Sequence, residues 1–316
     1  MSLRPAEAAT PARMPHANTV LLTVLAMLAF AGNSLLCRLA LKGTTIDAGT
    51  FTLARVAAAA AVLWLIVMAR RQVSRAGVRG ISLGGNWVSA LALFCYAAAF
   101  SFAYERLSAG TGALLLFAAV QATMVGYGLY AGELLRAPQW SGLALALAGL
   151  VWLMLPSLAT PPLVSSLLMI AAGIAWGVYS LRGKRAADPV ETTAGNFVRA
   201  VPMALALGAA IHAQRSLDGV GLAYAVLSGA ITSGLGYVIW YTAVPQLRAA
   251  TAATVQLSVP VITAAGGIAL LGEALTLRLA LSAAAVLGGI ALVITGKRDE
   301  VGQRTVDHRG AGGTHE

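Results

Sequence analysis

Nine aromatic and amide side chains fall inside the most apolar stretches of this chain, where such groups need an explanation. They are Asn33, Tyr96, Phe117, Gln121, Trp176, Tyr179, Tyr237, Trp240 and Gln256. Tyr237 and Trp240 are three residues apart and therefore share one face of a helix. Aromatic faces bind apolar bulk or a positive ammonium group, and a few amides orient a polar solute. Each residue alone is explained more readily by core packing, but together they predict a cavity that binds an organic small molecule.

The elements that must position these side chains are long hydrophobic runs. The chain is 58% hydrophobic and 11% charged, whereas soluble domains carry roughly 25% charged residues. A membrane-spanning helix needs roughly 20 apolar residues, and helices are required because lipid offers no partner for free backbone groups. Ten runs fit: 20–41, 51–69, 87–104, 111–131, 140–155, 163–181, 197–211, 220–244, 249–271 and 277–295. The sequence predicts an all-α integral membrane protein with ten transmembrane helices.

Groups that catalyse reactions or bind metals lie outside the centres of these runs. All twelve carboxylates and all four histidines fall in tails, loops or helix ends. Cys37 and Cys95 lie inside runs, but their spacing is typical of neither a metal site nor a disulfide framework. Paired aspartates and a His-Glu-x-x-His motif are absent, which disfavours a membrane protease. We expect no enzyme activity, cofactor or metal and, without a buried carboxylate relay, at most weak coupling to an ion.

A duplication organises the runs. The stretch 107–135 recurs at 247–275 without a gap, and both copies end in Gly-Glu-x-Leu. Weaker matches relate 30–35 to 176–181 at an offset of 146, and 53–55 to 197–199 at an offset of 144. A repeat on this scale indicates that the whole unit was duplicated. We expect a first five-helix repeat at 19–156, a linker at 157–162 and a second five-helix repeat at 163–296.

Charge predicts how the chain is threaded. Ten spans put both ends on one side, and the loops and tails on that side would hold fifteen basic residues against five on the other. This bias predicts cytoplasmic tails at 1–18 and 297–316. It also explains the net charge of +10 without a nucleic-acid partner. Because five is odd, the second half enters the membrane in the opposite sense, which makes an inverted repeat.

Inverted repeats have a mechanical consequence. Two halves of similar sequence can exchange conformations, which converts an outward-open molecule into an inward-open one around a site near the membrane midplane. The duplication therefore favours transport over the alternative of a duplicated scaffold. Small-residue ridges at 128–132, 173–177 and 285–289 allow close helix approach, either for static packing, which we prefer, or for sliding.

Four charged residues near predicted helix ends have alternative roles. Glu133 and Glu273 follow glycines at matching span ends and would act as a gate or, preferably, as a cap at the start of the next helix. Arg55, at a helix edge, and Arg38 are expected near the outer membrane face, where they could meet a carboxylate or, preferably, form salt bridges or set orientation.

These features resemble the drug/metabolite transporter superfamily, specifically its EamA-type exporters. The segment 259–273 is similar to the strongest family signature, although Val120 stands in the first half where Pro260 stands in the second. Within the family, the stretch 119–124 and the aromatic set are most similar to bacterial exporters of aromatic amino acids, which also expel methyl viologen. The resemblance covers about 21–297 and implies alternating access around a central cavity, in a bacterial inner (plasma) membrane.

Two functions follow as expectations. The first is export of amino acids and similar amphiphilic metabolites, and the alternative is a multidrug exporter of quaternary ammonium compounds such as viologens. The expected partners are a small-molecule substrate and the lipid bilayer. A membrane enzyme would need a nucleophile or metal set that the sequence lacks.

Overall fold

The computed structural model describes residues 15–73, 84–132, 134–155, 160–183, 186, 188–211, 217–247 and 255–296. Within these residues every regular element is a helix, so the all-α prediction is confirmed for them. The elements in order are α1 (His16–Gly43), α2 (Ala48–Val73), α3 (Trp87–Tyr104), α4 (Ala109–Tyr130), α5 (Ala137–Met154), α6 (Leu163–Gly183), α7 (Pro189–Ala210), α8 (Gly219–Leu227), η2 (Ser228–Leu235), α9 (Gly236–Ala243), η3 (Val244–Gln246), α11 (Ser258–Leu271) and α12 (Leu277–Gly296).

Within the part of the chain that the structure describes, seven helices are long and apolar enough to cross a membrane. They are α1 to α6 and the continuous helix Gly219–Gln246, while Ser258–Leu271 and Leu277–Val293 form shorter apolar helices. The ten apolar runs all overlap helices of the structure. The count of ten spans stays a prediction. α7 is not among these seven helices, and the apolar segments Ser258–Leu271 of α11 and Leu277–Val293 of α12 are shorter than 18 residues.

Helix starts differ from the predicted boundaries at two places. α7 begins at Pro189 rather than at 197, because Asp188 accepts hydrogen bonds from the backbone N–H groups of Val190 and Glu191 and so caps a polar first turn. α1 begins at His16, inside the predicted tail. Residues 1–14 and 297–316 of the tails, half of the linker (157–159) and the start of the ninth run at 249–254 lie outside the described residues.

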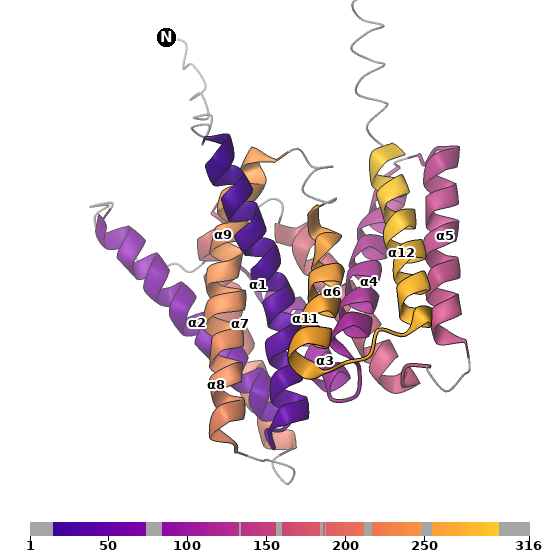
Figure 1. The fold of residues 1–316 in the computed structure, drawn as a ribbon. Helices are drawn as coiled ribbons and strands as arrows, with labels where there is room; N and C mark the ends of the chain where they lie inside the picture. Colours follow the sequence, from indigo (N-terminus) through magenta and orange to yellow (C-terminus); the bar gives the residue numbers. More distant parts are fainter. Residues whose placement is uncertain are drawn as a thin grey trace, which may run out of the picture.

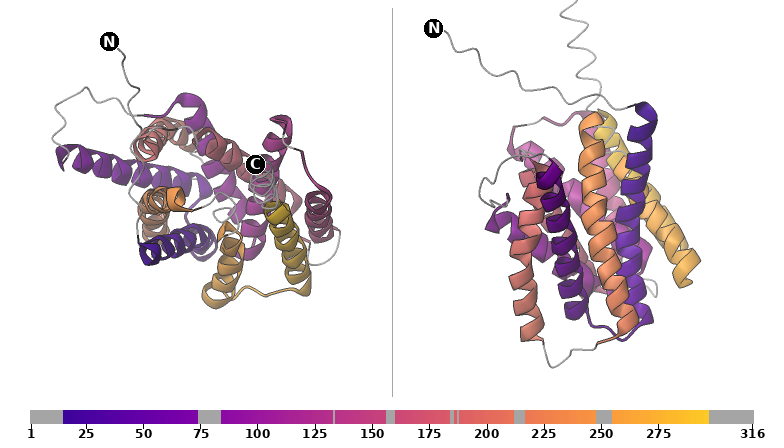
Figure 2. Two further views of the ribbon diagram at one scale, coloured as in Figure 1. Left: turned by 90° about the horizontal axis from the view of Figure 1, so that it is seen from above. Right: turned by 90° about the vertical axis from the view of Figure 1, so that its left-hand side faces the viewer.

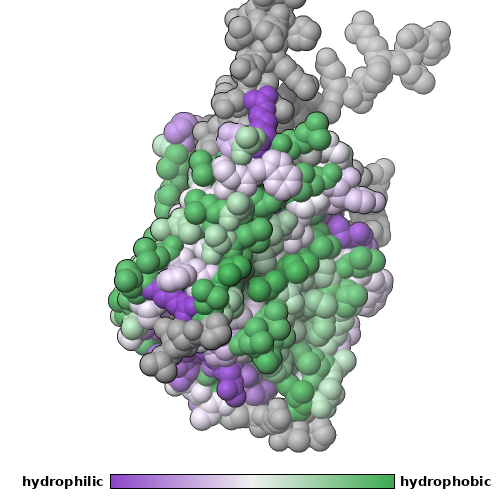
Figure 3. All heavy atoms as spheres, turned by 90° about the vertical axis from the view of Figure 1, so that its right-hand side faces the viewer, coloured by the Kyte–Doolittle hydropathy of each residue, from purple (hydrophilic) through white to green (hydrophobic). Residues whose placement is uncertain are grey.

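The outer surface is apolar where α5 and α12 lie side by side. Figure 3 shows this side of the molecule, with hydrophobic residues across the face and hydrophilic residues mostly toward its ends. Exposed side chains on these two helices include Leu147, Val151, Trp152 and Leu281. An exposed apolar face of this extent is expected for a surface that contacts lipid.

Helices of the first half pack mainly on helices of the second half. α3 and α4 pack on α6, α2 packs on α7 and η2, α1 packs on α9 and α11, and α5 packs on α12. α1 begins and α12 ends at the same end of the bundle, uppermost in Figure 1, and Figure 2 shows the arrangement from two further sides. We call this the terminal end, and the opposite end the far end.

Small residues permit the closest of these contacts. A Cβ added at Gly173 would lie 2.6 Å from the Leu116 carbonyl oxygen of α4, and one added at Gly289 would lie 2.4 Å from the Gly142 carbonyl oxygen of α5. The ridges at 173–177 and 285–289 therefore hold helices in close contact. The predicted ridge at 128–132 is wrong at Gly132, which follows the end of α4 with φ +88° and has nothing within 4 Å of its Cβ position.

The eighth run is a helix with a π-helical segment in its middle. η2 (Ser228–Leu235) lies between α8 and α9 and turns Ser228, Thr232 and Ser233 toward the protein interior, where all three are buried. π-helical turns are rare and are found frequently at functional sites. At Gly229 an added Cβ would lie only 2.1 Å from the carbonyl oxygen of Arg55, so η2 and α2 approach each other backbone to backbone.

Candidate functional site

A narrow cavity with a volume of about 30 Å³ lies between the two halves. Its walls come from α1, α3 and α4 of the first half and from α6, η2, α9 and Gln256 of the second. The lining residues are Phe30, Asn33, Ser34, Tyr96, Phe100, Leu116, Phe117, Trp176, Thr232, Ser233, Tyr237 and Gln256. Apolar walls with a few polar groups are typical of small-molecule sites.

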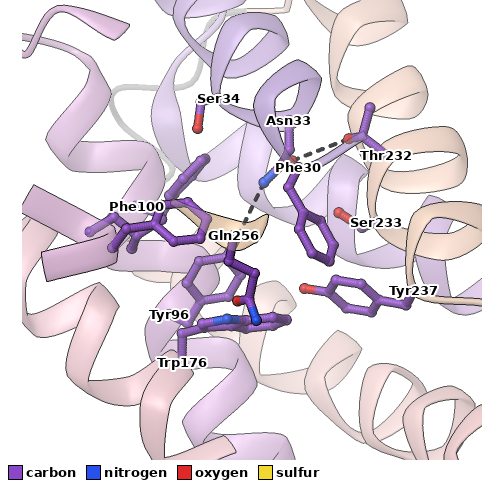
Figure 4. Close-up of a pocket in the computed structure, with 12 residues that line it drawn as sticks. Phe30, Asn33, Ser34, Tyr96, Phe100, Trp176, Thr232, Ser233, Tyr237 and Gln256 are labelled. Atoms are coloured by element: carbon purple, nitrogen blue, oxygen red, sulfur yellow. Dashed lines mark hydrogen bonds between the residues drawn. The ribbon is translucent and has the colours of Figure 1, made fainter. Parts of the chain in front are cut away.

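Aromatic rings form most of the cavity wall. The Trp176 ring lies 4.9 Å from the Tyr96 ring and 5.1 Å from the Tyr237 ring, measured between centroids. The Phe30 ring is edge-on to Tyr237 at 6.1 Å. Figure 4 shows the rings of Tyr96 and Phe100 on one side of the space, those of Phe30 and Tyr237 on the other, and the Trp176 indole below. The contacts are at the distances that aromatic pairs prefer, so the wall is preorganised.

A hydrogen-bonded amide links the halves at the cavity wall. Asn33 Oδ1 accepts from Ser228 Oγ at 2.7 Å and from Thr232 Oγ1 at 3.4 Å, both on η2. Asn33 Nδ2 donates to the Tyr96 hydroxyl oxygen at 3.1 Å. The π-helical segment therefore places two hydroxyl groups on one amide of the opposite half, and that amide holds the Tyr96 hydroxyl in place.

Arg55 lies behind the same wall, and its prediction as a residue at a helix edge is wrong. Its side chain sits in the second turn of α2 and is 2% exposed. The guanidinium donates to Asn33 Oδ1 at 3.4 Å and to the Ala97 carbonyl oxygen at 3.1 Å. It also faces the rings of Phe100 at 4.9 Å and Tyr96 at 5.6 Å, contacts that stabilise a cation. The burial of Arg55 depends on partners from other helices, and the apolar runs of the sequence do not show which helices are neighbours.

The structure brings six of the nine predicted site residues to this cavity. Asn33, Tyr96, Phe117, Trp176, Tyr237 and Gln256 line it. The other three predicted residues do not line the cavity. Gln121 is buried beyond the lining of the cavity, Trp240 packs against the Phe30 ring at 5.9 Å, and Tyr179 lines a second pocket.

Sequence reasoning missed half of the lining residues. Phe30 could have been found from the duplication, because the match at an offset of 146 pairs it with Trp176. Ser34, Thr232 and Ser233 are small hydroxyl residues, which are common inside membrane helices, so their types carry no signal. Their place in the wall follows from the packing of α1 against η2.

The far end of the bundle is closed by an ion pair between the halves. Arg38 Nε and Glu273 Oε1 are 3.2 Å apart, with side chains 12% and 10% exposed. Glu273 Oε2 also accepts from the Ala109 backbone N–H at 2.8 Å, so it caps the first turn of α4. The expected cap at the start of the next helix, α12, is wrong. There the Leu279 backbone N–H donates to Thr276 Oγ1, while the Glu273 carboxylate caps α4 of the other half. Glu133 lies outside the described residues.

Further contacts reinforce this closure. Arg38 donates to the carbonyl oxygens of Tyr104 at 2.8 Å and Glu105 at 3.0 Å, and Lys42 donates to the Leu271 carbonyl oxygen at 3.1 Å. Partial burial raises the pKa of the Glu105 carboxyl, and the Ala48 backbone N–H opposes that shift. The end of α1 is thereby fastened both to the end of α3 and to the end of α11.

Replacing Glu273 by glutamine is expected to loosen the far end. The amide can still accept from the Ala109 N–H, but Arg38 loses its charged partner, and a buried charge left without one is costly. Cys37 is 0% exposed beside this pair. In a Cys95→Ser background we expect alkylation of Cys37 by N-ethylmaleimide to become about tenfold faster, which corresponds to ~1.4 kcal/mol of opening free energy.

The matched control for this prediction is Glu191→Gln. Glu191 pairs with Arg71 at 3.0 Å, between α2 and α7, and its loss should leave Cys37 as protected as in the parent. Equal alkylation rates for the Glu273 variant and the parent would show that the ion pair does not keep the far end closed.

A second, polar pocket lies toward the terminal end. It is lined by the start of α3, the end of α6, the start of α7 and Tyr241 of α9, and its volume is about 230 Å³. Arg182 donates there to Ser89 Oγ at 3.0 Å and to Asn86 Oδ1 at 3.3 Å. Tyr179 and Tyr241 line this pocket, while Trp176 and Tyr237, one turn away on the same helices, line the central cavity. A layer of aromatic rings thus separates the two spaces.

Among the described residues, no group of three or more His, Cys, Asp or Glu side chains is placed to hold a metal ion. The polar groups of the cavity are amides and hydroxyls held by other side chains. This arrangement can bind and orient a solute.

The chain has recognisable relatives. The model of the EamA-like transporter family matches residues 163–295, which is the predicted second half. The uncharacterized protein PA1977 of Pseudomonas aeruginosa is 54% identical over 281 residues, which are 89% of this chain and 96% of that protein. A protein of known crystal structure has a TM-score of 0.62 at 20% identity, covering 88% of this chain and 98% of its own, and that likeness concerns the fold alone.

Proposed function

This chain belongs to the EamA-like transporter family, and from that premise we propose that it exports amino acids and similar amphiphilic metabolites by alternating access around the central cavity. The observation that carries the proposal is the cavity itself. It lies between the halves, its walls are aromatic, and its polar groups come from both halves. Such a site suits a solute that has an apolar body and a small polar head.

The pattern of helix packing supports the inverted repeat. The inverted repeat would pair α1 with α6, α2 with α7, α3 with the α8–η2–α9 helix, α4 with α11 and α5 with α12. When the members of each pair are exchanged, the contact α3–α6 becomes α1–α9 and the contact α4–α6 becomes α1–α11. All four of these contacts are present in the structure, and the contacts α2–α7, α4–α11 and α5–α12 are unchanged by the exchange. A molecule packed in this way can exchange the conformations of its halves without new partners.

The two ends of the bundle differ as alternating access requires. The far end is closed by Arg38, Glu273 and Lys42, and the terminal end carries the polar pocket. We propose that both termini are cytoplasmic in a bacterial inner membrane, so that this conformation is closed on the outside. The ten spans and the five-helix repeats at 19–156 and 163–296 belong to the same proposal.

Flux in proteoliposomes tests the proposed function. Purified protein should release a labelled amino acid such as L-phenylalanine from preloaded liposomes faster than protein-free liposomes do. The Glu273→Gln variant in the same assay links the closed end to transport. If no amino acid in a full panel moves, the proposed export of amino acids is wrong.

The alternative is export of quaternary ammonium compounds. Aromatic faces around the cavity favour it, because Trp and Tyr rings attract organic cations. Cells that express the protein would then resist methyl viologen, while amino-acid flux would be absent. The two functions are distinguished by running both assays on the same preparation.

Transport is expected to depend weakly on a proton gradient. The predicted site residues are aromatic, amide or hydroxyl side chains, and the cavity lining includes no carboxylate or histidine, so the cavity offers no relay of the kind that couples carriers to protons. A pH difference of two units across the liposome membrane should change steady-state accumulation of substrate by less than about twofold. Accumulation that follows the imposed gradient would contradict this prediction.

A further inference from the structure

A buried positive charge lies behind the cavity wall, and none of the carboxylates that the structure describes compensates it. Arg38, Arg70 and Arg71 each have a carboxylate within 4.0 Å. Arg55 is more deeply buried than any of them, and among the described residues no carboxylate lies within that distance of its guanidinium. Its hydrogen-bond acceptors are the neutral oxygens of Asn33 and Ala97.

Such a charge is expensive to keep. Burying an ion without a counter-ion costs several kcal/mol, and ionisable residues inside a membrane protein mark substrate or ion pathways. The faces of Phe51, Phe100 and Tyr96, at 6.0, 4.9 and 5.6 Å from the guanidinium, offset part of the cost. These contacts stabilise the cation but leave its charge unneutralised.

The charge lies one side chain behind the cavity. Three of its partners, Asn33, Tyr96 and Phe100, line the space directly. Arginine can only donate, so the atom of Asn33 that faces Arg55 must be the oxygen. The Asn33 NH₂ group is thereby directed to the Tyr96 hydroxyl oxygen. Because that oxygen accepts a hydrogen bond, the Tyr96 O–H hydrogen can be donated to an acceptor in the cavity.

We propose that Arg55, acting through Asn33 and Tyr96, makes the central cavity selective for amphiphiles that carry a carboxylate. The carboxylate lies at the Tyr96 side, where it supplies the counter-charge that Arg55 lacks. The apolar body of the solute, with an ammonium group where there is one, lies among Phe30, Trp176 and Tyr237. A dication such as methyl viologen meets the field of Arg55 and is disfavoured. The inference rests on the proposed function, since it names the substrate class of the same site.

Ligand binding tests the inference apart from transport. Thermal unfolding of the purified full-length protein is followed with four probes: L-phenylalanine, 3-phenylpropionate, L-phenylalaninamide and methyl viologen. A ligand that binds the folded state raises the unfolding temperature according to its affinity. We expect the two carboxylates to bind at least about tenfold more tightly than the amide and the viologen.

Variants at Arg55 then assign the selectivity. Arg55→Met should remove the preference for L-phenylalanine over its amide, and Arg55→Lys, which keeps the charge, should retain part of it. The matched control is Arg199→Met. Arg199 occupies the equivalent position of the second half at an offset of 144. It donates to the carbonyl oxygens of Gly84 and Gly195 and does not line the central cavity, so its loss should leave the preference unchanged.

The outcomes separate the inference from the proposed function. Amide or viologen binding as tight as that of L-phenylalanine, no binding of any probe, or a preference that survives Arg55→Met would overturn the inference. If Arg55→Met does not fold, the four probes on the parent and on Arg55→Lys decide it. If amino acids are transported without a preference for carboxylates, the proposed function is supported and the inference is wrong. If carboxylates bind selectively but no amino acid is transported, the inference is supported and the proposed function is wrong.

Discussion

Replacing Trp176 by alanine is expected to lower the initial rate of amino-acid flux by at least about tenfold while the protein stays folded. The indole lies in the cavity wall and contacts the rings of Tyr96, Tyr179 and Tyr237 at 4.9, 5.5 and 5.1 Å. Aromatic contacts contribute roughly 0.5–1.5 kcal/mol each beyond burial. Without the indole, a solute bound among these rings loses one contact face. The remaining rings also lose the neighbour that holds them in place. The measurement is flux of labelled L-phenylalanine in proteoliposomes of equal protein content.

Two controls make this prediction specific. Trp140 is 53% exposed near the start of α5, away from the cavity, and Trp140→Ala should transport at the rate of the parent. Trp176→Phe keeps a ring in the wall and should transport at an intermediate rate. Parental flux in Trp176→Ala would remove Trp176 from the site and weaken the proposal that this cavity binds substrate.

Replacing Gly229 by alanine is expected to cause the largest loss of stability of any single methyl addition near the site. The new Cβ would lie 2.1 Å from the Arg55 carbonyl oxygen and 3.0 Å from the Ala58 Cβ. The nearest atom is helix backbone and cannot rotate away, so η2 and α2 must separate. Overpacking typically costs about 1–3 kcal/mol, and here it also displaces Arg55 and the Asn33 hydrogen bonds. We expect a lower unfolding temperature and a smaller monodisperse fraction in size-exclusion chromatography.

The control for Gly229 is a glycine with free space around it. A Cβ added at Gly288 of α12 meets nothing within 4 Å, so Gly288→Ala should leave the unfolding temperature unchanged or raise it, because alanine favours the helix. Parental stability in Gly229→Ala would mean that α2 and η2 are not in close contact, and the position of Arg55 behind the cavity would then be in doubt.

The amino-acid sequence by itself determined the class of protein and the positions of the helices. The reason is that lipid imposes a local rule: a span must be a helix of about 20 apolar residues, and such runs are visible without knowledge of their neighbours. The duplication was also visible in the sequence, because two copies of one stretch can be aligned from their residue types alone. The same alignment pairs Phe30 with Trp176, so it held a signal for Phe30 that the predicted site residues left out.

Only the tertiary structure decided which polar groups meet. Arg55 looked like a residue at a helix edge because its neighbours in the sequence are ordinary, yet it is enclosed by rings from α2 and α3 and by an amide from α1. Glu273 looked like the cap of its own next helix, yet it pairs with Arg38 and caps α4. Each of these positions depends on contacts between residues far apart in the chain. Hydrophobic periodicity reports which stretches enter the membrane, and it carries no information on which helix lies against which.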